Sequence, residues 1–392
     1  MEENLLLVPL PVTGRGTSGW GLVMLFDLNP KTRREDLYDR ESELKEIFSA
    51  LDLGERFIVI YGVRRVGKTS LLRVALREAG VLHAIIDVRK VYFEHRSVSK
   101  IYLYKEVANY FAKNLSLFRR LGFKVKDFFK RLKGFHITQV GVEVEPIPQI
   151  SFTDLLERIN DWCERRNLRF VLSFDEAQYL RFSGKVRYDG IFAWCIDNLP
   201  NVTIIVTGSE VELLREFLRI NDPKAPLFGR YMREIYVDRF TRDQSIDFLK
   251  QGFKELGVEP NIEEIEEVVE RFDGIVGWLT HYGYYRAVKK MNHEASLREV
   301  FEKGSQLELI ELEKLIAPSR KRYTAILKAV AQGATTWSDI KTYLIVKTGY
   351  IDDKTFTQLL KNLVKHGYLV KENNKYKIPD PIVEYLVKEK LQ

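Results

Sequence analysis

Short apolar runs rich in β-branched and aromatic residues alternate, in the N-terminal part of the chain, with longer segments of helical periodicity. The runs are Phe57–Tyr61, His83–Asp87, Phe170–Phe174, Val202–Val206 and Glu234–Val237. Continuous apolar runs of strand length, separated by helix-compatible stretches, are typical of parallel strands that are buried on both faces. The pattern therefore predicts an α/β domain with a parallel sheet over residues 1–240.

A long insertion, residues 90–168, separates the second and third runs. Its middle reads RRLGFKVKDFFKRLKG at residues 119–134, which indicates amphipathic helices with a basic face. Such a face is more typical of a solvated surface than of a ligand site. The sequence leaves the role of this insertion open, as it does for residues 1–25.

Helical periodicity replaces the strand pattern after Arg242. Asn261 followed by Glu264 is typical of a helix start, and helices are expected as far as Ile316. Ala317, Pro318 and Ser319 then form a junction. We therefore expect a helical domain over residues 241–317.

The last 75 residues have a third pattern, that of a winged helix-turn-helix over residues 318–392. Three helices are expected, each with a recognisable face, start or stop. Their markers are Tyr323, Ile326, Leu327, Val330 and Gly333 for the first, Thr336 and Asp339 for the second, and Phe356, Leu359, Leu360, Leu363, Val364 and Gly367 for the third. The run YLVKENNKYKI then alternates around Asn373 and Asn374, which predicts a hairpin that would be the wing.

Charge is distributed unevenly between these segments. The chain of 392 residues has a formal charge of +7, and residues 318–392 hold 14 Lys and Arg against 7 Asp and Glu, so this segment alone accounts for +7. A positive field therefore belongs to the C-terminal segment. Two cysteines without metal-ligand spacing, and an N-terminal apolar stretch preceded by acids, indicate a cytoplasmic protein without a secretory signal or membrane span.

The segment GVRRVGKTS directly follows the first apolar run and precedes a helix-forming stretch. It fits G-x-x-x-x-G-K-[ST], the spacing of a loop whose backbone amides surround phosphate. Lys68 would reach the β- and γ-phosphates, and Thr69 would be a ligand of Mg²⁺. The residues expected to contact the nucleotide are Gly62, Val63, Arg64, Arg65, Val66, Gly67, Lys68, Thr69 and Ser70.

An acidic pair ends the third run, FVLSFDE. We expect Asp175 to hold Mg²⁺ with Thr69, and Glu176 to polarise the attacking water. A carboxylate beside the metal-holding acid favours water over a bound acceptor as the nucleophile, so the pattern favours hydrolysis over phosphotransfer.

Two further polar features lie where this chemistry could use them. The fourth run ends in VTGS, so Thr207 or Ser209 could bond the γ-phosphate or the attacking water, although a simple turn explains them equally well. Arg230, in PLFGR, precedes the fifth run. It could reach the γ-phosphate bound to a neighbouring subunit of a homo-oligomer, or form a surface ion pair.

Together GVRRVGKTSLL, LSFDEAQ, VTGS, PLFGR and FDLNPKTRREDLYDRESEL resemble the archaeal ATPase family within the AAA+ and STAND group of P-loop ATPases. The resemblance covers about residues 26 to 285. It implies that Lys68 and Thr69 belong to the Walker A motif, that Asp175 and Glu176 are the Walker B pair, and that Ser209 or Thr207 is the first sensor.

The resemblance also implies that Arg40, within Asp39-Arg40-Glu41, lies near the adenine, and that the helices after residue 240 form a lid with the segment FDGIVGWL. Val63 and Val276 stand where the family often has proline. The second sensor of the lid is not identified, with Arg286 and His281 as candidates.

ATP with Mg²⁺ is the expected substrate and cofactor. The basic winged helix suggests duplex DNA as a partner, through Lys354, Thr357, Gln358, Lys361 and Lys365 of its third helix and Lys371, Lys375 and Lys377 of the wing. Winged helices also dock proteins. The sequence therefore leaves two functions open, an ATPase that engages DNA and a slow nucleotide-gated switch that docks a protein partner.

Overall fold

The computed structural model describes residues 24–114, 135–137, 142–144 and 151–391. The helices predicted at residues 119–134, and all but the end of segment 1–25, lie outside the described residues. Within the insertion, β3 (Phe135–Ile137) pairs antiparallel with β4 (Val142–Val144), a pairing that the sequence did not predict.

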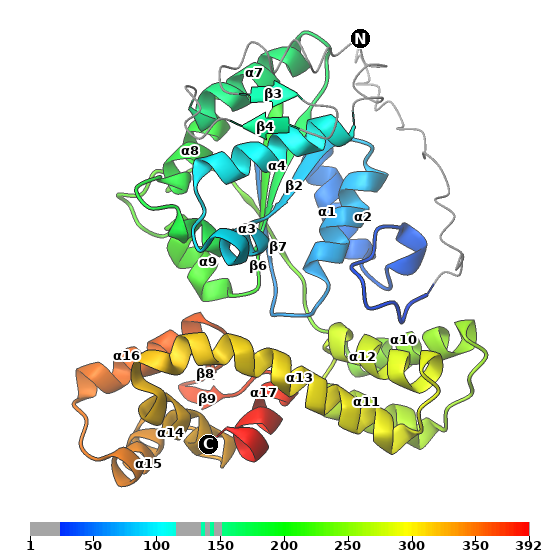
Figure 1. The fold of residues 1–392 in the computed structure, drawn as a ribbon, viewed down its shortest axis with the longest axis vertical. Coiled ribbons are helices and arrows are strands. Elements are labelled where there is room, and N and C mark those ends of the chain that lie inside the picture. Colours follow the sequence, from blue (N-terminus) through cyan, green and yellow to red (C-terminus); the bar gives the residue numbers. More distant parts are fainter. Residues whose placement is uncertain (1–23, 115–134, 138–141, 145–150, 392) are drawn as a thin grey trace.

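A five-stranded parallel sheet forms the centre of the N-terminal part (Figure 1). Its order is β2 (Leu82–Asp87), β5 (Phe170–Asp175), β6 (Val202–Gly208), β1 (Phe57–Tyr61) and β7 (Arg233–Tyr236). All five predicted runs are strands, and every neighbouring pair is parallel, so the predicted α/β class is confirmed.

Alternate residues of the central strands enter two different cores, which is why β1, β5 and β6 are buried along their whole length. In β1, Phe57, Val59 and Tyr61 pack on one face, and Ile58 and Ile60 on the other. The first face is covered by α3 (Val88–His95), α4 (Lys100–Lys113), α7 (Phe152–Glu164), η2 (Ala177–Phe182), α8 (Tyr188–Asn198) and α9 (Val211–Leu218). The second is covered by α1 (Glu41–Asp52) and α2 (Lys68–Glu78). Cys163 and Cys195 are free and buried in the first core.

Helices replace strands after β7. They are α10 (Arg242–Glu255), α11 (Ile262–Phe272), α12 (Val276–Gly283), the π-helix η3 (Tyr284–Val288) and the long α13 (His293–Ile316). Thr241 and Gln244 form a capping box at the start of α10, and the Asn261 side chain accepts a hydrogen bond from the Glu263 amide at the start of α11.

The segment before the sheet, which includes the 3-10 helix η1 (Arg34–Asp36), is fastened to these helices. Phe26 is fully buried in their core. A Cβ at either Gly252 or Gly283 would lie 2.4 Å from its ring, so only glycine leaves room for it. The Lys31 amide also donates to Ser70 Oγ at 3.0 Å, so this segment joins the helices to the phosphate loop.

The C-terminal part has the predicted winged-helix order. The 3-10 helix η4 (Ala317–Ser319) leads into α14 (Arg320–Ala331), α15 (Trp337–Thr348), α16 (Asp353–Lys365), β8 (Val370–Glu372), β9 (Lys375–Lys377), α17 (Pro381–Tyr385) and the π-helix η5 (Leu386–Lys390). Asn373 and Asn374 both have positive φ, as a tight turn between two strands requires.

One helix, α13, is shared between the last two parts and runs below the sheet domain from one to the other (Figure 1). Its residues Leu297 and Val300 lie in the core of α10 to α12, whereas Leu312 and Ile316 lie in the winged-helix core. The domain boundaries at residues 240 and 317 stay predictions.

Candidate functional site

The loop at residues 62–67 joins β1 to α2 and needs both of its glycines. A Cβ at Gly62 would lie 2.5 Å from the carbonyl oxygen of Val237, so the close approach of the two backbones excludes a side chain. Gly67 has a φ of +96°, in the left-handed region that favours glycine, immediately before the first residue of α2. The loop therefore brings backbone amides to the N-terminus of α2, as anion binding requires.

Lys68 lies beneath this loop and is 5% exposed. Its Nζ donates hydrogen bonds to the carbonyl oxygens of Gly62 at 2.8 Å and Val63 at 2.7 Å. Burial lowers the pKa of Lys68 to about 8, and the negative charge of Glu176 opposes this shift. A buried ammonium is therefore held where it can turn from loop carbonyls to a bound phosphate.

Thr69 and Asp175 are in direct contact across α2 and β5. Thr69 Oγ1 donates a hydrogen bond to Asp175 Oδ2 at 2.8 Å, and Thr207 donates to the other carboxylate oxygen. Burial raises the pKa of Asp175, although both hydrogen bonds oppose this effect. A hydroxyl and a carboxylate side by side are hard oxygen donors of the kind that Mg²⁺ prefers, so these residues fit the ion.

Glu176 follows β5 in a left-handed backbone conformation, with a φ of +56° that is uncommon for a residue other than glycine. One carboxylate oxygen, Oε2, accepts hydrogen bonds from Ser209 Oγ at 2.7 Å and Gln178 Nε2 at 2.6 Å. Burial alone would raise the pKa of Glu176, but Lys68 and Arg89 lower it below its usual value. The site therefore holds an ionised base.

The two hydroxyls of the VTGS turn contact these acids. Thr207 Oγ1 donates to Asp175 and also accepts a hydrogen bond from the Glu176 amide at 3.2 Å. Ser209 donates to Glu176 and lines the cavity described next. Both side chains thus orient the acidic pair.

A cavity of about 990 Å³ opens over the loop. Its lining includes the polar residues Lys68, Thr69 and Glu176. It also includes a set of apolar and aromatic residues, Leu25, Leu37, Tyr38, Phe240, Phe248 and Val276. A wall from α13 contains Leu307, Glu308, Ile310 and Glu311. This mixed lining matches a ligand with a charged part and an aromatic part.

Arg64 and Arg65 of the loop make ion pairs with distant parts of the chain. Arg64 lies 2.7 Å from a Glu210 oxygen and 2.5 Å from a Glu311 oxygen. Arg65 lies 3.3 Å from Glu308, and its guanidinium is 4.0 Å from the centre of the Trp278 ring. The loop is therefore in contact with α13 and α12.

Arg40, expected near the adenine, is buried at the cavity wall. Its guanidinium pairs with Glu43 at 3.0 Å and donates to the carbonyl oxygens of Val66 at 3.1 Å and Asp238 at 2.8 Å. It also lies 4.7 Å from the ring centre of Phe240. These contacts give it a clear role in joining the phosphate loop to the segment after β7.

Arg230 lies outside the cavity of its own chain. It forms a two-pronged ion pair with Asp197 and donates to the carbonyl oxygen of Pro226. Of the two second-sensor candidates, Arg286 pairs with Glu264 at 3.2 Å and does not line the cavity. His281 does line it, and burial, aided by the charge of Arg65, lowers the pKa of His281 to about 4, so its ring is neutral at neutral pH.

The surface proposed to meet DNA is only partly free. Lys354, Lys361, Lys371, Lys375 and Lys377 are exposed. Lys365, however, pairs with Glu216 of α9 at 2.6 Å, so the end of α16 rests on the sheet domain.

The sequence analysis missed several charged residues of the cavity wall, among them Arg89, Glu308 and Glu311. A usable signal existed for Arg89 because it follows β2 by two residues, and the carboxyl ends of parallel strands meet at one edge of the sheet. No comparable signal existed for the acids of α13, which read as ordinary polar positions of a long helix.

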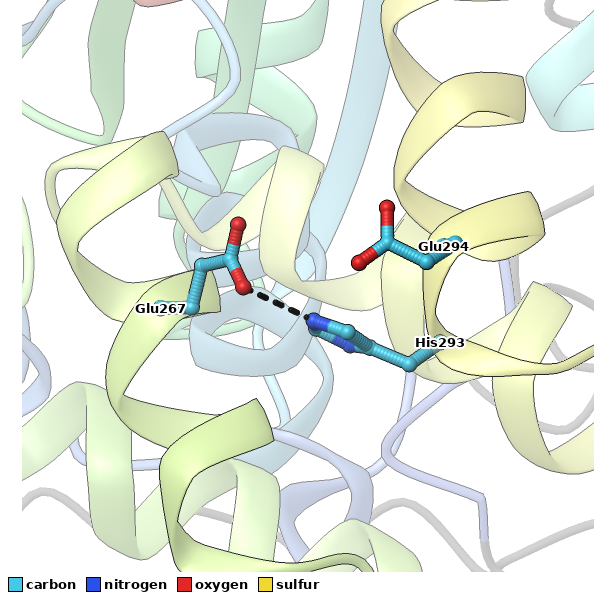
Figure 2. Close-up of side chains that lie close together, drawn as sticks. All are labelled: Glu267, His293 and Glu294. Carbon is cyan, nitrogen blue, oxygen red and sulfur yellow. Dashed lines mark hydrogen bonds and ion pairs between the residues drawn. The ribbon is translucent and has the colours of Figure 1, made fainter.

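Figure 2 shows a second cluster, in which the ligand atoms of Glu267, His293 and Glu294 lie within 4.8 Å of one another. His293 Nδ1 bonds with Tyr282 Oη at 2.8 Å, and its Nε2 lies 3.1 Å from Glu267 Oε2. Both ring nitrogens are thus engaged in fastening α11 and α12 to the start of α13. The cluster has a structural explanation.

Comparisons with known proteins agree with this geometry. Residues 37–281 match the family described as the ATPase domain predominantly from Archaea, and residues 318–379 match the C-terminal winged helix-turn-helix domain of MCM proteins. A solved structure of a Walker-type ATPase from Pyrococcus abyssi is 36% identical, with a TM-score of 0.81 over 93% of this chain and 100% of that one.

More distant structures share the fold. The ORC2 protein of Aeropyrum pernix in its ADPNP and ADP complexes is 14% identical, with a TM-score of 0.59 over 93% of this chain and 98% of that one. A search among curated proteins found no match. Among the described residues, no helix is both long and apolar enough to cross a membrane. The phosphate loop, the acidic pair and the family match lead to one conclusion: the chain belongs to the archaeal family of P-loop ATPases.

Proposed function

We propose that this protein binds ATP with Mg²⁺ and hydrolyses it to ADP and phosphate. The observation that carries the proposal is the contact between Thr69 Oγ1 and Asp175 Oδ2, next to a buried Lys68 and an ionised Glu176. These are the groups that phosphate binding, metal binding and activation of water require.

The cavity supports a definite orientation of the nucleotide. The phosphates would lie against the loop amides and Lys68, with Thr69 and Asp175 as protein ligands of the ion. The adenine would lie near the aromatic residues Tyr38, Phe240 and Phe248 of the cavity lining. This arrangement of phosphate-binding and aromatic residues favours ATP as the substrate.

In the proposed reaction, a water oxygen bonds to the γ-phosphorus while the bond from that phosphorus to the β–γ bridging oxygen breaks. Glu176 accepts the proton that the water loses, and its Oε2 stays anchored by Ser209 and Gln178. Lys68 offsets the negative charge on the β- and γ-phosphates. Bound Mg²⁺ supplies further neutralisation of the phosphate oxygens.

Hydrolysis would alter the arrangement of the domains. Arg64 and Arg65 belong to the loop that holds the phosphates, and their side chains contact α13. A change in the charge of the bound phosphates would therefore alter the contacts of α13, the helix that joins the lid to the winged helix. DNA engagement through the exposed lysines of the winged helix is the output that we favour.

A second function is favoured by one observation, the contact of the winged helix with the sheet domain. Lys365 pairs with Glu216, and His366 lies 3.4 Å from Glu210, so part of the helix expected to read DNA is covered. A slow nucleotide-gated switch would use ATP or ADP to set this contact and expose the domain to a protein partner.

Steady-state ATP turnover, measured with and without duplex DNA at two salt concentrations, tests the proposal. Turnover that DNA stimulates, with a stimulation that weakens at high salt, supports the DNA-engaging ATPase. Very slow turnover with tightly retained ADP supports the switch. If the wild-type chain hydrolyses ATP no faster than Lys68→Ala, the hydrolysis proposal fails.

A further inference from the structure

A cation that the proposed reaction does not use, Arg89, lines the cavity together with Lys68 and Glu176. β2 ends at Asp87, which lies opposite Asp175 in the register of the parallel strands. Arg89 follows two residues later, in the first turn of α3. The geometry of the sheet therefore brings this side chain to the same edge as the acidic pair, and Arg89 shares the cavity wall with Lys68 and Glu176.

The charges at this edge act on one another. Burial raises the pKa of Glu176, whereas the positive charges of Lys68 and, to a smaller extent, Arg89 lower it. Arg89 also contributes to the lowered pKa of Lys68. Arg89 thus belongs to the same electrostatic group as the residues that would meet the terminal phosphate.

Arg89 is only loosely held. Its NH1 lies 3.6 Å from Glu311 Oε1, beyond ordinary hydrogen-bond distance, and its side chain is 41% exposed. Glu311 is held more closely by Arg64, at 2.5 Å. An exposed ion pair of this length contributes little to stability. A phosphate group, which carries more negative charge than a carboxylate, can therefore replace Glu311 as the partner of Arg89.

We propose that Arg89 is a catalytic residue supplied by the same chain, whose guanidinium leaves Glu311 and bonds the γ-phosphate of ATP. This inference rests on the proposed hydrolysis. In the reaction, Arg89 offsets the charge that develops on the γ-phosphate oxygens as the bond to the bridging oxygen breaks. It accepts no proton and forms no covalent bond.

The proposal has a regulatory consequence. The Glu311 carboxylate and the γ-phosphate are alternative partners for one guanidinium, so ATP weakens the contact between α3 and α13 and ADP does not. A second contact between these two helices lies close by, where Lys314 Nζ of α13 is 4.1 Å from the ring centre of Phe93 of α3.

The test measures turnover and nucleotide binding in the full chain, with ADP and the non-hydrolysable analogue ADPNP as probes. We expect Arg89→Ala to lower kcat by about 10²-fold or more, as for other groups that stabilise transition-state charge. It should weaken ADPNP binding by about tenfold, which corresponds to one lost charged contact, and leave the Kd for ADP unchanged. Arg89→Lys keeps the charge but loses the planar fork, so it should be intermediate.

Glu311→Gln tests the competition. It should raise the affinity for ADPNP, and this gain should disappear when Arg89 is also replaced by alanine. Glu313→Gln is the matched control, since Glu313 lies on the same helix, pairs with Arg320 and does not line the cavity. A thermal unfolding curve for each variant shows whether the fold is kept.

The possible outcomes distinguish the role of Arg89 from the proposed hydrolysis itself. If the wild-type chain hydrolyses ATP and Arg89→Ala keeps both its kcat and its preference for ADPNP over ADP, the role of Arg89 is excluded while the proposed function stands. Equal weakening of ADP and ADPNP would also exclude it, because that result indicates a purely structural role. If the wild-type chain itself neither binds ADPNP nor hydrolyses ATP, the proposed function fails first.

Discussion

The amide of Gly277 donates a hydrogen bond to the carbonyl oxygen of Arg65 at 2.9 Å. The first turn of α12 therefore lies directly on the phosphate loop. The approach is close because a Cβ at Gly277 would lie 2.7 Å from the Cβ of Arg65 and 3.1 Å from its carbonyl oxygen. Arg65 itself has a φ of +64°, an uncommon conformation for arginine that this contact supports.

Gly277→Ala should therefore separate the lid from the loop. We expect a lower melting temperature, consistent with an overpacking cost of about 1–3 kcal/mol, and weaker binding of ADP by calorimetry. Gly190→Ala in α8 is the control, since its added Cβ would meet neighbours no nearer than 3.9 Å. If both variants bind ADP equally well, lid contact with the loop does not contribute to nucleotide affinity.

Glu176→Gln should preserve nucleotide binding and block hydrolysis. The amide keeps the size of the side chain but cannot accept the proton of the attacking water, so kcat should fall by about 10²–10⁴-fold. Lys68→Ala provides the contrast because it should abolish binding itself. Normal turnover by Glu176→Gln would show that another group is the base.

Nucleotide affinity should decrease as the pH rises through about 8, the value to which burial lowers the pKa of Lys68. The unliganded protein loses the Lys68 proton above this pH, whereas a bound phosphate favours the ammonium form. Binding therefore takes up a proton, and affinity should fall by about tenfold per pH unit in the alkaline range. Calorimetric titration of ADP between pH 7 and 9.5 measures this dependence, and an affinity that is constant over that range would contradict it.

Arg230→Ala should affect turnover only where chains associate, because Arg230 lies outside the cavity of its own chain. Asp197→Asn is the matched control, since it removes the same ion pair but keeps the arginine. Turnover measured over a range of protein concentrations separates the cases. Equal effects of both variants would indicate a structural ion pair, and full activity of Arg230→Ala in every oligomeric state would remove the role in a neighbouring subunit.

Alanine substitutions on the winged helix should weaken the binding of duplex DNA and also make that binding less dependent on salt. The positions to replace are Lys354, Lys361, Lys371 and Lys375. Each lost phosphate contact should reduce the slope of log K against log salt by about 1. Lys250 and Lys254, exposed lysines of α10, are the control positions. Fluorescence anisotropy at several salt concentrations measures both quantities, and an unchanged slope would exclude this surface.

The sequence predicted the elements whose signals are local. The three central strands, β1, β5 and β6, are buried along their whole length because both faces of the sheet are covered there, whereas the edge strands β2 and β7 are only partly buried. The winged helix was readable from its caps and turns, such as Thr336 before α15 and the Asn373–Asn374 turn. The phosphate loop was predicted from its spacing and its flanking strand and helix, and the acidic pair from its position at the end of an apolar run.

The contacts between domains could not be predicted. Arg64 and Arg65 were predicted only as loop residues that contact the nucleotide, and Glu308 and Glu311 read as polar positions of a helix more than 240 residues later in the chain. Their pairing depends on how α13 crosses the sheet domain, which no local pattern determines. The left-handed conformation of Glu176, between β5 and η2, was equally unpredictable, since no glycine or asparagine marks that position.

The sharing of α13 between two cores has a mechanical consequence. Its 24 residues span roughly 36 Å at 1.5 Å per residue, and its two ends are buried in different hydrophobic clusters. Such a helix is a stiff lever arm. If α13 tilted by about 10° about the end that packs beside α12, its other end would move by on the order of 6 Å, given the length set by the helical rise. A small rearrangement around a phosphate would thereby become a displacement as large as a helical turn.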